Sequence, residues 1–395
     1  MSVLVLNCGS SSAKFAVIDP VSGKEHISGI AQRLGSPEAT LDWKHNGTKG
    51  SHAIPGAGHD QALRDVVARL REMGLVYALV VVGHRVVHGG SKFSGSMAIT
   101  PEVVAKVEEC IPLGPLHNPP NLLGIKIAQE LFPGLLQVGV FDTAFHQTMP
   151  PVAYTYPVPH EWLEQHGVRR YGFHGTSHRF VARRALELTG LPADDHGLIT
   201  LRLGNGCSSA AVRNGKSVET TMGLTPLEGL MMGTRSGSVD PAIVGHVATA
   251  TGRSAAEVID LLNKKSGLLG VSGLSNDMRT VEEAAGNGHD RATLALELFC
   301  YVLAKSTASL VVPLGRLDAL AFTGGIGENS ATVRAKTLGY LGFLGLTVDP
   351  AANARHGKDQ HGRITTGTRP QALVVPTNEE LMIAMDTAEI AQARR

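Results

Sequence analysis

Residues 3–14 read VLVLNCGSSSAK, an apolar run that enters a turn of glycine and serine and continues into a second strand-like run, FAVID. Two later stretches have the same character: LITLRLGNGCSS at residues 198–209 and LDALAFTGGIGENS at residues 317–330. A strand that enters a tight turn of glycine, serine and asparagine presents backbone N–H groups and hydroxyls toward one point, which suits phosphate oxygens. Three such turns indicate a nucleoside triphosphate held from several sides.

None of the three turns is a P-loop, which requires GxxxxGK and then Ser or Thr between a strand and a helix. Lys14 leads directly into a strand-like run, so the first stretch predicts an antiparallel hairpin. The second stretch continues into AAVRNG, where Asn214-Gly215 is a hairpin turn signal. Aligned on Gly9 and Gly204, the two hairpins share their turn position and strand pattern. This indicates a weak internal duplication, although glycine–serine turns are common enough for two hairpins to look alike by chance.

The composition is that of a globular protein. The 395 residues suffice for two domains of ordinary size, with 43% hydrophobic and 18% charged residues. A net charge of +1 gives no reason to expect nucleic acid or an acidic membrane as a partner. The four cysteines form no CxxC pair, the N-terminus lacks a basic signal region, and no apolar stretch approaches the roughly 20 residues that span a bilayer. We therefore expect a cytoplasmic protein without a membrane segment.

Strand-like and helix-like stretches alternate along the chain, which predicts an α/β fold with covered sheets. Helices are expected at 59–74, 100–111, 121–134, 284–312 and 378–395, and buried strands at 77–90 and 135–145. A proline- and tyrosine-rich stretch, PPVAYTYPVP at residues 150–159, marks a domain boundary. The expected domains are 1–148 and 149–380, and the helix at 381–395 returns to complete the first.

Phosphoryl transfer needs cations aimed at the transferred group, a bridging metal and an aligned nucleophile. Arg85, in GHRVVHGG, and Arg235, in GLMMGTRSGSVDP, stand in stretches that are too rich in glycine to be simple helix surface. We expect both in loops that contact a ligand. The alternative is an arginine that is exposed or ion-paired, which is the commoner environment of this residue.

Two further positions suggest chemistry. His174 and His178 have i, i+4 spacing, but a zinc site of the HExxH type would need a glutamate, and Gly175 disfavours the start of a helix there. An imidazole that donates to a developing phosphoryl charge fits His174 better. Asp142 ends a buried strand, where a carboxylate often faces a ligand, although it could instead cap the following turn.

Oxygen donors for Mg²⁺ stand beside turns at Asn7, Glu379 and Glu380. First-turn helix charges, which the helix dipole favours, would explain one of the two glutamates without any metal.

These stretches together resemble the acetate kinase family of the acetate and sugar kinase, Hsp70 and actin superfamily. The resemblance runs nearly end to end and rests on LVLNCGSSSAKFA, VGHRVVHGG, PLHNPPNLLGI, VFDTAFHQTMP, RRYGFHGTSH, GNG, GLTPLEGLMMGTRSG, LNKKSGLLGVSGLSNDMR, FTGGIGENS and PTNEELMIA. It implies two ribonuclease-H-like, actin-like ATPase domains with duplicated βββαβαβα cores and a cleft between them. It also implies reversible transfer of phosphate between ATP and acetate, Mg²⁺ (or Mn²⁺) as cofactor, and a homodimer.

The resemblance assigns roles to matching positions. The catalytic residues would be Arg85, Asp142, His174 and Arg235. The acetate site would consist of Arg85, Val87, Leu116, Phe173 and Pro226. The metal would be held by Asn7 and Glu379. The nucleotide would contact Ser10, Ser12, Lys14, Arg202, Gly204, Asn205, Gly206, Asp277, Met278, Arg279, Gly324, Gly325, Ile326, Gly327 and Glu328.

Asp142 needs no role as a base, because an acetate nucleophile has a pKa near 4.3 and is already ionised at neutral pH. We expect it to orient Arg85 or metal-bound water. The sequence departs from the family at two positions: Arg202 stands where His is usual, in RLGNG, and Ser238 stands where Asp is usual, in TRSGS. Both changes make the site more positive, so we expect them to affect the rate of phosphoryl transfer more than the kind of reaction.

Two alternatives stay open at this point. A kinase for a slightly larger acid such as propionate would differ at the acid pocket, where Val87 is bulky. An ATP-binding regulator that has lost transfer is supported only by Arg202 and Ser238.

Overall fold

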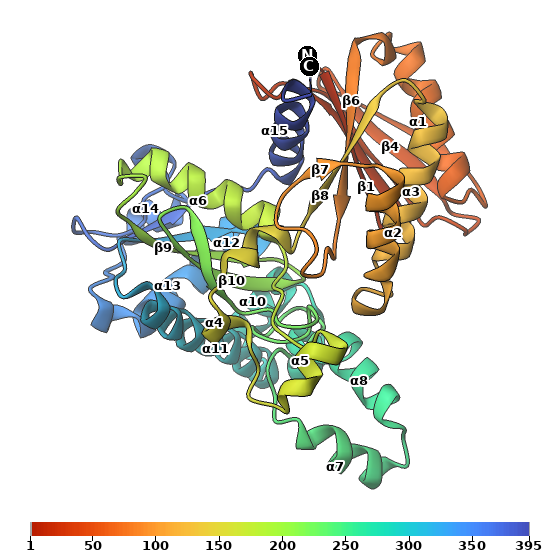
Figure 1. Cartoon of the computed structure of the whole chain (residues 1–395). Coiled ribbons are helices and arrows are strands. Elements are labelled where there is room, and N and C mark those ends of the chain that lie inside the picture. Colours follow the sequence, from red (N-terminus) through yellow and green to blue (C-terminus); the bar gives the residue numbers. More distant parts are fainter. Residues whose placement is uncertain (1, 395) are drawn as a thin grey trace. The chain divides into compact units, whose positions relative to one another are not determined.

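The structure is a computed structural model that describes residues 2–394. The chain forms two compact units, each with its own sheet (Figure 1). The first unit consists of Met1–Gln147 with Asn378–Arg395, and the second of Thr148–Thr377. The mixed α/β class expected from the sequence is confirmed.

The sheet of the first unit has eight strands in the order β5-β4-β3-β2-β1-β6-β8-β7. The central strand β1 pairs antiparallel with β2, from Val3↔Ile18 to Cys8↔Ala13, and parallel with β6 on its other side. The predicted first hairpin is therefore confirmed. The strands are β1 (Ser2–Cys8), β2 (Ser12–Ile18), β3 (Glu25–Gln32), β4 (Thr40–His45), β5 (Thr48–Ala53), β6 (Leu79–Val86), β7 (Met97–Ala98) and β8 (Leu136–Phe141).

The sheet of the second unit has the order β11-β10-β9-β12-β13. Its strands are β9 (Gly197–Leu203), β10 (Cys207–Arg213), β11 (Lys216–Thr220), β12 (Ala319–Thr323) and β13 (Gln371–Val374). Strand β9 pairs antiparallel with β10 and parallel with β12, as β1 pairs with β2 and β6. Both sheets thus contain the core order 3-2-1-4-5, which confirms the internal duplication. Asn214 and Gly215 link β10 to β11 with φ of 52° and 75°, as a primed hairpin turn requires.

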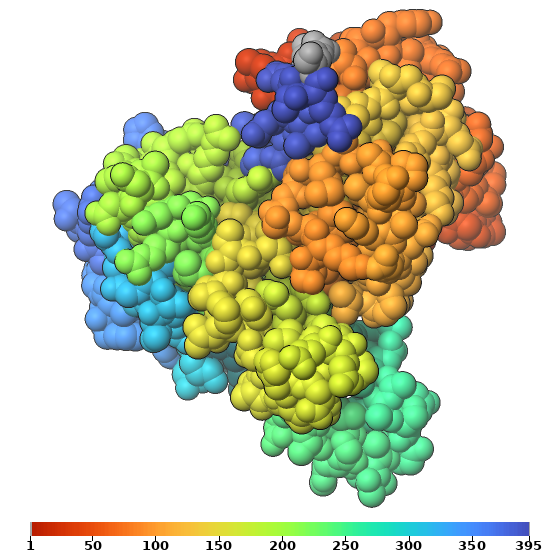
Figure 2. All heavy atoms as spheres, viewed as in Figure 1, coloured from red at the N-terminus to blue at the C-terminus, as the bar shows by residue number. Residues whose placement is uncertain are grey.

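The helices of the first unit cover its sheet. They are α1 (His59–Glu72), α2 (Pro101–Glu109), α3 (Asn118–Leu131) and α15 (Glu379–Gln392), with short 3₁₀ turns η1 (Val76–Ala78), η2 (Ile111–Leu113) and η3 (Ala144–Thr148). Helix α2 begins as its sequence predicts, because the Thr100 side chain accepts a hydrogen bond from the Val103 N–H and Pro101 takes the first position. Helix α15 packs on β1, β6 and β8, and Figure 2 shows the C-terminal segment against N-terminal segments.

A glycine in the middle of β6 permits this close packing. A Cβ atom at Gly83 would collide with Thr387 Oγ1 and approach Ile383 Cγ2 to 3.0 Å. Gly83 is therefore a site of close approach inside a strand and not the start of a loop.

The second unit contains eleven helices of α type in its described residues: α4 (Pro151–Tyr154), α5 (His160–His166), α6 (Gly175–Thr189), α7 (Ala242–Thr251), α8 (Ala255–Lys264), α9 (Gly267–Ser272), α10 (Met278–Gly286), α11 (Asp290–Leu314), α12 (Gly324–Asn329), α13 (Ala331–Tyr340) and α14 (Pro350–Ala354). Short 3₁₀ turns η4 (Gly342–Leu344) and η5 (Lys358–Gln360) complete it. Helix α6 packs on β9 and β12, whereas α15 packs on the first sheet. Thus α6, which comes after the last strand of the first sheet in the chain, packs on the second sheet, and α15, which follows the last strand of the second sheet, packs on the first.

The continuous helix expected at 284–312 is wrong, because the structure has two helices there. Helix α10 ends at Gly286, Gly288 takes a left-handed φ of +84°, and the His289 side chain caps α11 by accepting from the Ala292 N–H. Helix α11 is also long and apolar enough, by length and composition alone, to cross a membrane, contrary to the expectation that no apolar stretch approaches that length. It packs on β9, β10 and β11 and on three helices, α9, α10 and α13, as a core helix does.

Candidate active site

In the first unit, the parallel strands β6 and β8 end side by side and bring Arg85 and Asp142 together. Arg85 Nη2 lies 2.6 Å from Asp142 Oδ2, and Arg85 Nε lies 3.1 and 3.2 Å from the two carboxylate oxygens. Asp142 is only 2% exposed, so the two side chains form an ion pair whose carboxylate is buried. The expectation that Arg85 lies in a loop is wrong: it belongs to β6, and the glycine before it serves the packing of α15.

The same end of the first sheet gathers further oxygen donors and a lysine. Asn7 Oδ1 accepts from Arg85 Nη1 at 3.4 Å, and Asn7 pairs with Lys14 across the β1–β2 hairpin. Glu379 and Glu380, in the first turn of α15, line one small cavity with these three residues. Burial lowers the pKa of Arg85, but the charges of Asp142, Glu379 and Glu380 raise it, and the net shift is upward.

The serine turn of this hairpin is held rigidly. The Gly9 N–H donates to the Ser12 carbonyl at 2.8 Å, and a ring nitrogen of His59, at the start of α1, lies 2.7 Å from the Gly9 carbonyl. The Ser10 side chain is exposed in the turn, and Lys14 is exposed on β2. The turn thus offers hydroxyls to solvent near Asn7.

In the second unit, the glycine turn between β9 and β10 meets His174 and Arg235. A Cβ atom at Gly206 would lie 3.4 Å from Arg235 Nη1 and 3.6 Å from His174 Cε1. Arg235 donates to the Pro226 carbonyl at 3.2 Å, and no carboxylate in the described residues forms an ion pair with it. Burial lowers the pKa of Arg235, and so does the charge of Arg202. The turn therefore faces the Arg235 guanidinium, which has no carboxylate partner among the described residues.

His174 is fixed by a chain of buried hydrogen bonds. Its Nδ1 lies 2.8 Å from Ser208 Oγ, which lies 2.8 Å from His178 Nε2, and His178 Nδ1 lies 2.7 Å from Thr200 Oγ1. The Ser208 hydroxyl has one proton, so it donates to one imidazole and accepts from the other. The chain of hydrogen bonds thus fixes the orientation of the His174 ring through its Nδ1.

One expectation about this segment is wrong. Helix α6 does begin at Gly175, because His174 adopts a left-handed φ of 57° and serves as its N-cap. Both ring nitrogens of His178 lie within hydrogen-bond distance of hydroxyls, those of Thr200 and Ser208. Among the described residues, no group of three or more His, Cys, Asp or Glu side chains is placed to hold a metal ion.

The two departures from the family pattern have definite positions. Arg202 Nη1 donates to the Gly206 carbonyl at 3.2 Å, so the guanidinium braces the glycine turn from β9. The Ser238 hydroxyl accepts from the Gly229 N–H at 3.0 Å, and the Ser238 N–H donates to the Gly229 carbonyl at 2.9 Å. Ser238 therefore closes the loop that carries Arg235. Nearby, burial raises the pKa of the Cys207 thiol to about 11, so this buried cysteine stays neutral.

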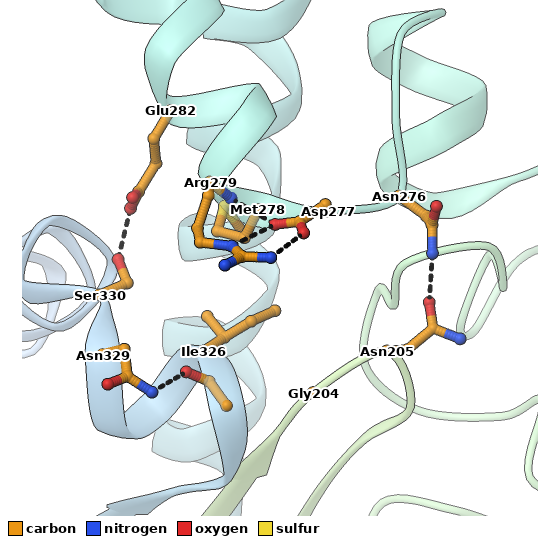
Figure 3. Close-up of a pocket in the computed structure, with 11 residues that line it drawn as sticks. Gly204, Asn205, Asn276, Asp277, Met278, Arg279, Glu282, Ile326, Asn329 and Ser330 are labelled. Atoms are coloured by element: carbon orange, nitrogen blue, oxygen red, sulfur yellow. Dashed lines mark hydrogen bonds and ion pairs between the residues drawn. The ribbon is translucent and has the colours of Figure 1, made fainter. Parts of the chain in front are cut away.

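A pocket of about 630 Å³ opens beside the glycine turn (Figure 3). Its walls are the turn, the start of α10 and helix α12. Asp277 pairs with Arg279 at 2.6 Å, and Figure 3 shows the Arg279 guanidinium and Ile326 projecting from opposite walls. The volume suits a ligand of nucleoside size. Seven residues proposed from the sequence line it: Gly204, Asn205, Asp277, Met278, Arg279, Gly325 and Ile326.

Four lining residues were not anticipated: Asn276, Glu282, Asn329 and Ser330. Asn276 Nδ2 donates to Asn205 Oδ1 at 2.9 Å, and Ser330 Oγ donates to Glu282. Asn276, Asn329 and Ser330 belong to motifs that carry the resemblance, so their polar character beside a glycine turn was the available signal. Glu282 lies one helical turn after Met278 and had no such signal.

Other proposed nucleotide residues lie outside the lining of this pocket. Gly324 and Gly327 pack against the backbone of β9 and β12, and the Glu328 carboxylate accepts from the Gly324 and Thr377 N–H groups. The third glycine stretch therefore forms a short helix, α12, and not an open turn.

The proposed acid-binding residues divide between the units. Val87 and Phe173 are buried, whereas Leu116 is 70% exposed. The Val87 N–H donates to Asn121 Oδ1 at 2.9 Å, and Pro226 lies against Arg235 through its carbonyl.

The sequence matches the model of the Acetokinase family over residues 2–385. The chain belongs to this family. The acetate kinase of Deinococcus radiodurans is 55% identical over 394 residues, which are 100% of this chain and 99% of that protein. The resemblance found in the sequence is confirmed, and the chain is a kinase of the acetate kinase type.

Solved members of the acetokinase family have the same fold. The acetate kinase of Porphyromonas gingivalis matches with a TM-score of 0.93 and 46% identity over 99% of both chains. The propionate kinase of Francisella tularensis matches with a TM-score of 0.94 and 42% identity over 98% of this chain and 99% of that one. Family membership implies ATP or ADP, a short carboxylic acid and a divalent metal ion as the reactants and cofactor.

Proposed function

We propose that this enzyme transfers the γ-phosphoryl group of ATP directly and reversibly to the carboxylate of acetate, in line, giving acetyl phosphate and ADP. The observation that carries the proposal is the full-length match to acetate kinases, combined with cationic groups gathered at the strand ends of both sheets.

Arg85 and Arg235 would offset the repulsion between an anionic acid and an anionic phosphoryl group. Asp142 would hold the Arg85 guanidinium in a fixed plane by its paired hydrogen bonds, and it would not act as a base. His174, whose ring is oriented by the hydrogen bond between Nδ1 and Ser208, would donate to the transferring group. Donors of this kind are worth most where charge develops in the transition state.

The pocket beside the glycine turn would hold the nucleoside, with Ile326 and the flat Arg279 guanidinium against the base. The phosphates would then extend past Gly206 toward Arg235, and Arg202 would strengthen the turn that receives them. Ser10, Ser12 and Lys14, from the hairpin of the first unit, would contact the same phosphates.

Mg²⁺ fits the donors of the first unit. It usually binds through one or two carboxylates and keeps waters and substrate phosphates, so it needs no complete protein cage. Asn7 and Glu379 line one small cavity and supply oxygen donors, and Glu380 lies beside them. A bound Mg²⁺ would neutralise phosphate charge there.

The test is acetyl phosphate formation, measured as its hydroxamate with acetate, ATP and Mg²⁺. The wild type is expected to form acetyl phosphate, and Arg235→Ala to lower kcat by ~10²–10³, the usual effect of removing such a donor. Lys216→Ala, an exposed change on β11, is the matched control and should keep wild-type turnover. Acetate-independent ATP hydrolysis in place of acetyl phosphate would contradict the proposal.

Propionate is the second candidate acid, because one well-matched solved structure is a propionate kinase. One methylene is worth only about 1–3 kcal/mol in an apolar pocket, so some propionate activity is expected. Val87, bulky and 8% exposed, favours the smaller acid. A higher kcat/KM for propionate than for acetate would reverse the assignment.

A homodimer and a cytoplasmic location complete the proposal. Helix α7 is apolar, yet none of its residues is buried within the chain, and Ile243 is 36% exposed. Exposed apolar surface of this kind marks an interaction site, and a second copy would cover it. Light scattering should give the mass of a dimer, and Ile243→Glu should give a monomer. All four cysteines are buried and unpaired, in keeping with a reducing compartment.

A further inference from the structure

A second cavity, of about 650 Å³, lies in the second unit and takes no part in the proposed reaction. Its floor is apolar and includes Phe180 and Leu188 of α6 and Val374 of β13. Its rim carries basic groups: Arg184, His356, Lys358 and His361. In Figure 1, α6 and α14, which precedes His356 in the chain, lie on the same side of this unit. The cavity thus combines an apolar floor with a cationic rim.

Part of the cationic rim has no protein counter-ion among the described residues. The only acid that these residues contribute to the lining is Glu328, and its carboxylate already accepts from the N–H groups of Gly324 at 2.9 Å and Thr377 at 3.2 Å. Arg184 has a partner, Glu187, at 2.6 Å on the exposed side of α6. Within residues 2–394, no hydrogen bond or ion pair engages the Lys358 ammonium or the His361 ring. These two groups are available to an anion.

A buried arginine adds positive charge behind the rim. Arg334 is 0% exposed and uses all five N–H groups: it donates to the Gly327 carbonyl at 2.8 Å and the Glu328 carbonyl at 3.0 Å, to Asn353 Oδ1 and the Asn353 carbonyl at 2.8 and 2.9 Å, and to His356 Nδ1 at 3.0 Å. None of these partners is a carboxylate. Burial lowers the pKa of Arg334 to about 10, so it is still charged at neutral pH.

The bond from Arg334 decides how His356 can act. Because Nδ1 of His356 accepts a hydrogen bond, Nε2 carries the ring proton in the neutral imidazole. Burial and the charges of Arg334 and Lys358 lower the pKa of His356, which keeps the ring neutral at pH 7. His356 is therefore a neutral N–H donor beside the cationic groups of the rim.

The loop that presents these histidines is held in a costly conformation. His356 and His361 have φ of 56° and 52°, and they are two of the six non-glycine residues with positive φ in the described chain. A Cβ atom at Gly357 would collide with the backbone of Gly362, so the loop closes tightly on itself. Left-handed backbone at non-glycine residues costs energy and concentrates at functional sites.

We propose that this cavity binds a small organic anion that carries a phosphate or carboxylate group on an apolar body, and that binding there is coupled to nucleotide binding through α12. Asn329 lines both this cavity and the proposed nucleotide pocket. Arg334 holds the Gly327 and Glu328 carbonyls near the end of the same helix. Arg334 also donates to His356, so a shift of His356 toward a bound anion would move the side chain that holds α12. The coupling rests on the proposed function, whereas the binding does not.

Phenyl phosphate is the probe, because it joins a dianion to an apolar ring. Calorimetric titration into the wild type, with Mg²⁺ and AMP-PNP saturating the nucleotide pocket, should show one site. Lys358→Ala with His361→Ala should weaken this binding by roughly tenfold or more, since each removes a charge-assisted hydrogen bond. Lys216→Ala, an equally exposed loss of one charge in the same unit, should leave it unchanged. Equal affinity in the wild type and the double variant would overturn the site.

A second variant separates this cavity from the site of phosphoryl transfer. Binding of phenyl phosphate should persist in Arg235→Ala, and its loss there would mean that the probe had bound at the transfer site. Phenyl phosphate should change the Kd of the wild type for AMP-PNP by about fivefold or more, and this change should vanish in the double variant. An unchanged Kd would overturn the coupling. The double variant should still form acetyl phosphate at the wild-type rate without phenyl phosphate, so failure of the proposed function would be seen separately.

Discussion

The ion pair between Arg85 and Asp142 predicts a loss of stability as well as activity in Arg85→Ala. The change removes a guanidinium 2.6 Å from a carboxylate that is 2% exposed, and it leaves this charge without its partner. Removing one partner of a buried pair costs about 3–5 kcal/mol. Because Arg85 is itself 19% exposed, water can replace part of its contact, and we expect the lower end of this range.

The assay must report on the first unit alone, because a chain of two units need not unfold in one step. The sequence contains two tryptophans, Trp43 in β4 of the first unit and Trp162 in α5 of the second. In a Trp162→Phe background, urea unfolding followed by Trp43 fluorescence measures the free energy of unfolding of the first unit. Adding Asp142→Asn to Arg85→Ala removes the stranded charge and should recover about half of the loss.

An exposed ion pair provides the control. Arg64 lies 2.9 Å from Asp60 on α1, with 48% and 55% of the side chains exposed, and Arg64→Ala should cost less than about 1 kcal/mol. Activity of Arg85→Ala should fall by ~10²–10³ in kcat. The reasoning is refuted if Arg85→Ala unfolds at the same urea concentration as the parent, or if Asp142→Asn lowers the stability of Arg85→Ala further.

Three other substitutions test single features of the site. Val87→Ala should raise kcat/KM for propionate relative to acetate, because it opens space in the proposed acid pocket, and an unchanged ratio would exclude this residue from the pocket. Arg202→His should raise the KM for ATP, and the increase should be larger at low than at high ionic strength, because salt screens a partly solvated charge. If the wild type and Arg202→His have the same KM at both ionic strengths, Arg202 only braces the Gly206 carbonyl. Ser208→Ala should lower kcat by roughly tenfold with little change in KM, as it cuts the hydrogen bonds that orient His174. Its control is Ser209→Ala, because the Ser209 hydroxyl is buried without a hydrogen-bond partner among the described residues, and equal kcat in both variants would contradict the relay.

Local signals in the sequence were sufficient for the hairpins and for four helices, α1, α2, α3 and α15. The Asn214-Gly215 turn and the Thr100-Pro101 helix start each depend on two adjacent residues, so no distant contact was needed to predict them. The duplication could be inferred because both first hairpins repeat the same turn and strand pattern.

Two glycines, Gly83 and Gly175, led to wrong expectations about local structure. Gly83 suggested a loop around Arg85, but it lies in β6 and makes room for Thr387 of α15, which is about 300 residues away in the sequence. Gly175 suggested that no helix began there, yet His174 takes the left-handed position and α6 follows. Packing against a helix distant in the sequence decides the first case, and the left-handed conformation of the adjacent His174 decides the second.

The site could be predicted as a set of residues but not as a geometry. A chain of hydrogen bonds joins α6, β9 and β10, running from Thr200 through His178 and Ser208 to His174. A serine or threonine in an apolar strand does not by itself indicate such a chain. The pairing of Arg85 with Asp142 follows from the register of β6 with β8, which only the sheet reveals.

The most direct test of the central claim is ³¹P NMR of the reaction with acetate labelled with ¹⁸O in the carboxylate, together with ATP and Mg²⁺. Direct transfer to the acetate oxygen predicts a growing acetyl phosphate signal that carries the ¹⁸O isotope shift of a bridging label, and an equal growth of ADP. Arg235→Ala should slow both signals together. Inorganic phosphate appearing in place of acetyl phosphate, or acetyl phosphate without the isotope shift, would contradict the account.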